Sequence, residues 1–118
     1  MTHTVTSLAD HKGYTGPRAV GDEYVVDAVI DITSYTANGE TITAASLGLG
    51  SVSAVMVTGL STDTISGGYS VSVISAEVGA GAATGGLYAS SSTFQINVPA
   101  ASNSDNLGEI RIRAYGNL

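Results

Sequence analysis

Two long segments near opposite ends of the chain alternate between apolar and polar residues. In residues 23–33, EYVVDAVIDIT, the apolar set formed by every second residue consists of Tyr24, Val26, Ala28, Ile30 and Ile32. In residues 109–116, EIRIRAYG, it consists of Ile110, Ile112 and Ala114. A period of two residues, rich in β-branched side chains, predicts strands that turn one face toward a core.

Three other segments have weaker strand patterns. Residues 51–58, SVSAVMVT, are apolar with little alternation, which favours a strand buried on both faces. Residues 69–78 change phase at Val73-Ile74, which predicts a β-bulge. Residues 87–99 alternate through Phe94, Ile96 and Val98 and end at a proline, which cannot donate to a strand ladder.

The segment 41–50, TITAASLGLG, has neither a strand pattern nor a loop composition. It follows Asn38-Gly39, a dipeptide that tolerates the left-handed backbone of tight turns. Thr43 is a suitable N-cap, 44–47 make one helical turn, and Gly48 ends that turn in left-handed geometry. Leu47 and Leu49 then anchor it to the sheet. We expect this segment to join the two halves of the domain.

The whole pattern gives five or six strands and no long helix. The Gly/Ser-rich connections 59–68, 79–86 and 100–108 are predicted loops. The fold class is therefore all-β: an antiparallel β-sandwich or barrel, jelly-roll or immunoglobulin-like. With 118 residues we expect one β-domain, 21–118, preceded by an N-terminal arm, 1–20.

The arm is polar, lacks a clear period and is interrupted by Gly13, Gly16 and Pro17. Two interpretations remain: a disordered terminus, or an extended arm that becomes ordered only against a neighbouring subunit. The spacing of His3 and His11 does not match a metal site. In the second interpretation, the arm's candidate partner-binding residues are Thr4, Val5, Lys12, Tyr14 and Arg18.

Charge is sparse and acidic. Ten acidic and four basic residues give a formal net charge of −6, which argues against binding nucleic acid or anionic membranes. Only 12% of residues are charged, so the surface must consist largely of Ser, Thr, Gly and Ala. Such a surface suits partners that pack closely against it, but it also fits an ordinary Ser/Thr-rich β-protein.

No catalytic constellation is present in the sequence. It has no cysteine, no paired-histidine motif and no G-x-S-x-G elbow. Asp27 and Asp31 share the outer face of the first strand, where solvated charges are a simpler interpretation than catalytic carboxylates or calcium ligands. Residues 103–106 lack the alternating acids of an EF-hand. We therefore predict a non-enzymatic protein without cofactor or metal, and the start of the chain shows no apolar leader.

The last strand directs Arg111, Arg113 and Tyr115 outward. Arg and Tyr are enriched at interface hot spots, so this row is a candidate contact between subunits. The alternative is intramolecular pairing of the two arginines with Asp27 and Asp31 on an adjacent strand.

Several of these segments together resemble small structural proteins of tailed-bacteriophage virions. The matching residues are Gly21 with YVVDAVIDIT (24–33), Asn38-Gly39-Glu40, ITAASLGLG (42–50) and IRIRAYG (110–116). The resemblance covers about residues 21–58 and 107–118 and does not extend to residues 59–106.

The resemblance implies a capsid decoration, or cement, protein. Such a protein would be made in the host cytoplasm, form a homotrimer and bind the major capsid protein on the outer surface of the shell, stabilising it. A tail or head-fibre component would share the fold. A carbohydrate-binding or adhesion β-sandwich is a further alternative, for which the available aromatic side chains are Tyr14, Tyr35, Tyr69, Tyr88 and Tyr115.

Overall fold

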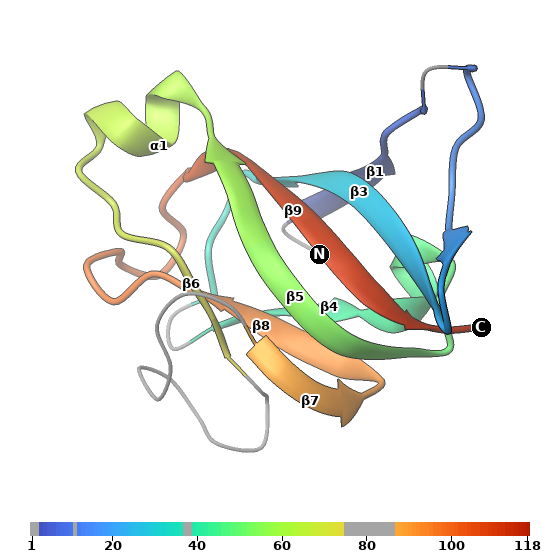
Figure 1. The fold of residues 1–118 in the computed structure, drawn as a ribbon. Helices are drawn as coiled ribbons and strands as arrows, with labels where there is room; N and C mark the ends of the chain where they lie inside the picture. The colour runs from blue at the N-terminus through green and yellow to red at the C-terminus, as the bar shows by residue number, and fades with distance from the viewer. Residues whose placement is uncertain (1–2, 11, 37–38, 75–86) are drawn as a thin grey trace.

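The computed structural model describes residues 3–10, 12–36, 39–74 and 87–118, which form nine antiparallel strands in two sheets (Figure 1). The six-stranded sheet has the order β1-β3-β9-β5-β7, with β2 also paired to β3. Its strands are β1 (His3–Ser7), β2 (Arg18–Val20), β3 (Glu23–Ile32), β5 (Ser51–Leu60), β7 (Leu87–Ser91) and β9 (Gly108–Asn117). The three-stranded sheet, in the order β4-β8-β6, contains β4 (Glu40–Thr43), β6 (Ser72–Ile74) and β8 (Thr93–Asn97). The all-β sandwich expected from the sequence is confirmed.

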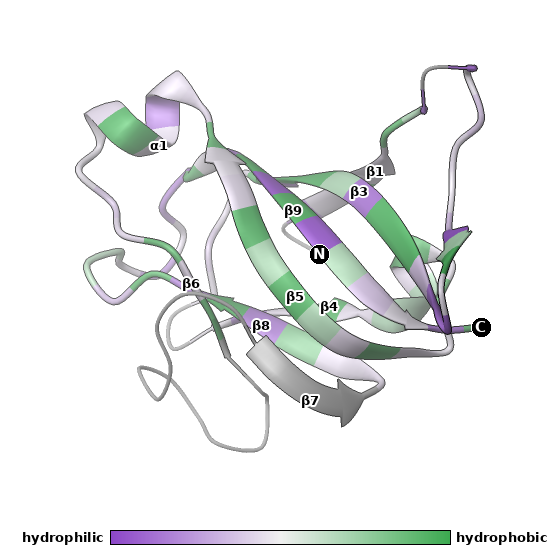
Figure 2. Ribbon diagram, viewed as in Figure 1, coloured by the Kyte–Doolittle hydropathy of each residue, from purple (hydrophilic) through white to green (hydrophobic). Residues whose placement is uncertain are grey.

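The two alternating strands lie side by side at the centre of the larger sheet. Ala28 is opposite Ile112 and Ile30 is opposite Ile110, and all four side chains are fully buried. Figure 2 shows the same alternation as hydrophobic and hydrophilic bands along β3 and β9. From the smaller sheet, Ile42, Phe94 and Ile96 complete the core, as expected for the strand of residues 87–99.

The helical turn is confirmed as the 3₁₀-helix η1 (Ala44–Leu47). Thr43 Oγ1 accepts a hydrogen bond from the Ser46 amide at 3.3 Å, and Gly48 ends the turn with φ +82°. Leu47 and Leu49 are both buried. Because β4 belongs to the smaller sheet and β5 to the larger one, this segment connects the two sheets, as predicted. Asn38 lies outside the described residues.

Strand β5 is not buried on both faces, because its Met56 side chain is 43% exposed. The register of β5 against β9 shifts between Val52 and Ala54 and again between Val57 and Gly59. Each shift inserts one extra residue into β5, so that the odd-numbered and even-numbered residues exchange faces of the sheet. The bulges, and not two-sided burial, explain why the apolar residues of this strand do not alternate.

The expected connections also differ in three places. The predicted loop 59–68 contains a short helix, α1 (Thr62–Ser66), capped by Ser61 and held by Thr64, whose hydroxyl donates to the Leu107 carbonyl at 2.5 Å. Residues 87–99 divide into β7 and β8, which belong to different sheets. Of the expected strand 69–78, β6 covers 72–74. Its register against β8 continues without a shift through Val73 and Ile74, so the β-bulge predicted at this step is wrong. Residues 75–86 lie outside the described residues, so the 79–86 loop stays a prediction.

The N-terminal segment pairs within its own chain, which corrects the interpretation that it becomes ordered only against a neighbour. β1 pairs with Ala28–Ile32, and β2 pairs with Glu23–Val25 on the same edge of β3. Val5 packs against the core, and His3 Nδ1 lies 2.5 Å from Glu40 Oε2. The backbone groups along the edge of β3 gain partners in this way, so residues 3–7 and 18–20 belong to the sandwich.

Candidate interaction surface

The outer face of the six-stranded sheet gathers most of the basic side chains of the chain. Arg111 and Arg113 extend from β9, and Arg18 reaches the same face from β2 at the sheet edge. Cross-strand neighbours follow from the register: Arg111 lies between Val29 and Gly59, and Arg113 lies between Asp27 and Met56. Side chains from β2, β3, β5 and β9 therefore build one surface.

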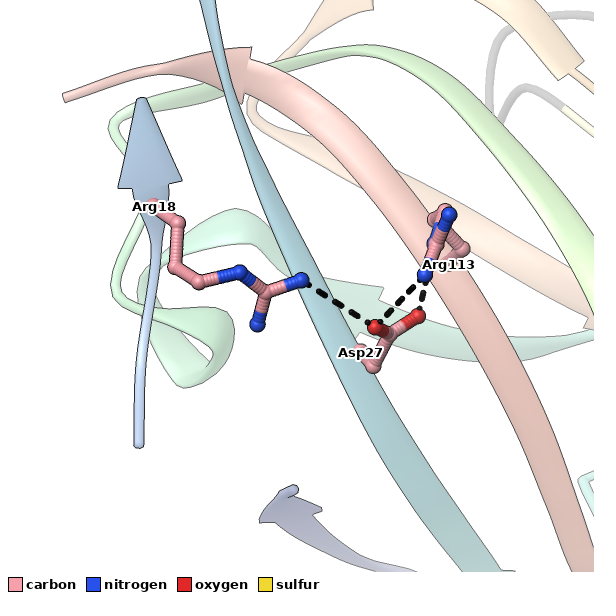
Figure 3. A network of polar contacts seen from close by, with 3 residues as sticks. All are labelled: Arg18, Asp27 and Arg113. Carbon is pink, nitrogen blue, oxygen red and sulfur yellow. Dashed lines mark hydrogen bonds and ion pairs between the residues drawn. The ribbon is translucent and has the colours of Figure 1, made fainter. Parts of the chain in front are cut away.

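Asp27 is the centre of an ion-pair network on this face (Figure 3). Arg113 donates to both carboxylate oxygens, from Nε to Oδ1 at 2.8 Å and from a terminal nitrogen to Oδ2 at 2.9 Å. Arg18 approaches Oδ2 at 3.4 Å from the other side. The Asp27 side chain is only 10% exposed, whereas that of Arg113 is 41% exposed. Two-point pairing of this kind fixes the guanidinium in one orientation.

The network determines the charge states of its members. Hydrogen bonds from Arg113 lower the pKa of Asp27 below its ordinary value, and partial burial opposes that shift. The same pair raises the pKa of Arg113, mainly through its hydrogen bonds to Asp27. Asp27 therefore stays ionised at neutral pH and neutralises part of the positive charge on this face.

Arg111 is in a different state, although only one residue separates it from Arg113 in sequence. Its side chain is exposed, and its guanidinium forms no hydrogen bond or ion pair with the residues that the structure describes. It borders a shallow, open hollow of about 300 Å³. The hollow is lined by Val29, Gly59, Leu60, Ser61, Glu109 and Arg111.

The same end of the face is acidic. Asp31 and Glu109 are directly opposite each other on β3 and β9, so two carboxylates share one cross-strand position. Like charges in this arrangement repel each other. A cation brought to this end by another molecule would relieve that repulsion.

Apart from Arg111, the partner-binding residues proposed from the sequence separate into three groups. Arg18 and Arg113 meet at Asp27, so the intramolecular interpretation holds for that carboxylate, whereas Asp31 faces Glu109. On β1, Thr4 is exposed on the outer face and Val5 points toward the core. On β9, Tyr115 is half-buried beside Val25. Lys12 and Tyr14 lie on the exposed loop between β1 and β2.

Two features of this region had no signal in the sequence. Met56 lies in an apolar run that resembled a buried strand, and only the bulges of β5 turn its side chain outward. The hollow arises where Gly59, which has no side chain, is opposite Arg111. Neither could be found without the register between β5 and β9.

The tyrosines proposed for carbohydrate stacking do not share one environment. Tyr35 is buried, and its hydroxyl accepts a hydrogen bond from the Val98 amide at 3.0 Å. Partial burial, with smaller effects from Asp105, raises the pKa of Tyr69. Tyr14 is 69% exposed, and the side chain of Tyr88 lies outside the described set.

No family model, curated protein or solved structure matches this chain. Within the described ranges, no helix is long and apolar enough to span a membrane. Within the same ranges, no three His, Asp or Glu side chains come together as a metal-binding group.

Proposed function

We propose that this protein is a non-enzymatic structural subunit that assembles with other protein subunits through the outer face of its six-stranded sheet. The observation that carries the proposal is an exposed Arg111 that forms no hydrogen bond or ion pair with the described residues and lies beside an open hollow, on a face that also exposes Met56. An exposed arginine next to accessible apolar surface has the composition of an interface hot spot.

The neighbouring ion pair supports the same conclusion. Arg113 is fixed by Asp27, so the centre of the face loses little side-chain freedom when a partner binds. The low share of charged residues, 12%, also reduces the number of ions that must be desolvated at an interface.

The sequence resemblance supports one particular assembly, the tailed-bacteriophage virion. In this proposal the protein decorates the outer surface of the shell, binds the major capsid protein and stabilises the particle, as a homotrimer. The resemblance rests on residues 21–58 and 107–118, which contain β3, β4, η1, most of β5 and all of β9. A tail or head-fibre component would use the same surface, and its position in the particle distinguishes the two.

Two measurements test this function. Mass spectrometry of purified, dissected virions locates the chain in heads or tails, and co-sedimentation measures binding of labelled protein to shells that lack it. We expect Arg111→Glu with Met56→Asp to abolish binding because both changes place negative charge on the proposed contact. Ala45→Glu adds charge at an exposed position of η1 and should bind as the wild type does. Absence from all particles, or normal binding by the double variant, would refute the proposal.

A further inference from the structure

The loop between β1 and β2 presents two side chains on a structured turn. Asp10 Oδ1 accepts hydrogen bonds from the amides of Lys12, at 2.8 Å, and Tyr14, at 3.0 Å, and the Asp10 amide donates to the Tyr14 carbonyl at 2.8 Å. The turn leaves the Tyr14 side chain 69% exposed and Lys12 exposed beside it. Figure 1 shows the loop projecting away from the edge of the sheet.

The hollow beside Arg111 has properties that complement this loop. Val29 lies on the outer face and contributes apolar side-chain surface, Leu60 also lines the hollow although its side chain packs toward the core, and Gly59 leaves open space. Glu109 contributes a carboxylate to its rim, and Asp31 lies directly across from Glu109. The hollow adjoins the start of α1, and Figure 1 shows α1 and the β1–β2 loop well apart on the molecule. The loop cannot reach the hollow of its own chain in this arrangement.

We infer that the loop of one copy docks in the hollow of a second copy of this chain, with Tyr14 inserted and Lys12 at the acidic rim. A hollow of about 300 Å³ is large enough for one aromatic side chain. The guanidinium of Arg111 stacks on the inserted ring, a pairing that aromatic side chains and arginine favour. The Lys12 ammonium meets Glu109 and Asp31, and it relieves the repulsion between these two carboxylates.

The distribution of charge on the chain, and not its net charge, favours this occupant. Two copies that each carry −6 repel each other, so self-association needs local contacts of opposite sign. Lys12 is one of only four basic residues, and the acidic rim is a surface of matching chemistry on the same molecule. Loop and hollow are different surfaces, which makes the contact heterologous and able to close into a ring. This inference rests on the proposed structural function and specifies its self-contact.

Sedimentation equilibrium of the full chain over a wide concentration range tests the contact. Tyr14→Ala should weaken self-association about 30-fold, whereas Tyr14→Phe keeps the ring and should change it little. Gly59→Phe should fill the hollow and weaken self-association about as much as Tyr14→Ala does. A Cβ at Gly59 would have Arg111 Cβ as its neighbour at an ordinary 3.8 Å, so the backbone at this position has room for a side chain to begin. Val20→Ala, at another highly exposed apolar position, is the matched control.

A charge exchange provides an independent test. Lys12→Glu alone and Glu109→Lys alone should each weaken association, and the variant that carries both should regain most of it. Far-ultraviolet circular dichroism and melting temperature establish that each variant is folded. A wild-type chain that remains monomeric, or single variants that associate normally, would overturn the inference.

The two proposals fail separately. A monomeric chain that still binds shells would overturn the docking of two copies and leave the structural function intact. If the chain self-associates but is found in no virion, the structural function in the virion is overturned and the docking of two copies stands. If Tyr14→Ala self-associates normally but loses binding to shells, the loop has a different partner and the inference is wrong.

Discussion

The two faces of the β3–β9 pair share one backbone and one register, yet they have different roles. On the inner face, Ala28, Ile30, Ile110 and Ile112 are fully buried. On the outer face, Asp27 and Arg113 form an ion pair that is partly open to solvent, and Arg111 forms no hydrogen bond or ion pair with the described residues. The inner face stabilises the fold by burying apolar area, and the outer face leaves Arg111 and Met56 exposed to solvent.

The largest effect should come from the inner face. Ile112→Ala removes a fully buried side chain at the centre of the sheet and should lower the free energy of unfolding by about 2–5 kcal/mol. Urea denaturation measures the change. A loss below about 1 kcal/mol would mean that the two faces contribute alike to stability.

The ion pair should have a smaller effect. Arg113→Ala leaves the Asp27 carboxylate, whose side chain is 10% exposed, with Arg18 at 3.4 Å and no two-point partner. We expect the free energy of unfolding to fall by about 1–2 kcal/mol, since both arginines are partly exposed. Arg113→Lys keeps the charge without the two-point geometry and should fall between wild type and Arg113→Ala in the same urea titration. A Lys variant as stable as the wild type would show that geometry contributes nothing.

The stabilisation by the Asp27–Arg113 ion pair should be lost at acid pH. The pKa of Asp27 is lower in the folded chain than in the unfolded chain, where aspartate titrates near about 3.9. The contribution of Asp27 is therefore complete above that unfolded value and is lost as the pH falls through the folded pKa. In Asp27→Asn, the free energy of unfolding should fall less steeply than in the wild type as the pH drops below about 4. Urea titrations at several pH values measure this. Parallel curves for the two proteins would contradict the assignment.

Arg111→Ala should have the smallest effect on stability. The exposed guanidinium forms no hydrogen bond or ion pair with the described residues and has only a weak electrostatic effect on Asp27, so the free energy of unfolding should change by less than about 0.5 kcal/mol. Its effect should appear in association, where the stacking partner of Tyr14 is lost. A destabilisation as large as that of Arg113→Ala would remove the distinction between the two arginines.

Local patterns in the sequence predicted several elements correctly. The alternation in β3 and β9 identified their core faces, because a strand exposes opposite sides at successive residues. Thr43 and Gly48 predicted both ends of η1, because a cap and a left-handed glycine act within a few residues. The outward direction of Arg111, Arg113 and Tyr115 followed from the same alternation.

Other features depended on contacts between distant residues. Which arginine meets Asp27 depends on the β3–β9 register, and the exposure of Met56 depends on bulges that appear only when β5 pairs with β9. The N-terminal segment looked patternless because its strands, of five and three residues, gain stability only from the edge of β3.

The sequence alone therefore determined the all-β class, the core faces of the two central strands and the turn between the sheets, because each follows from residues close together in the chain. The tertiary structure decided the place of the N-terminal segment, the partner of Asp27 and the hollow beside Arg111. Each of these features requires contact between side chains or strand edges that are far apart in the sequence. The pairing and register of the strands in the sheet decide which of these distant residues become neighbours.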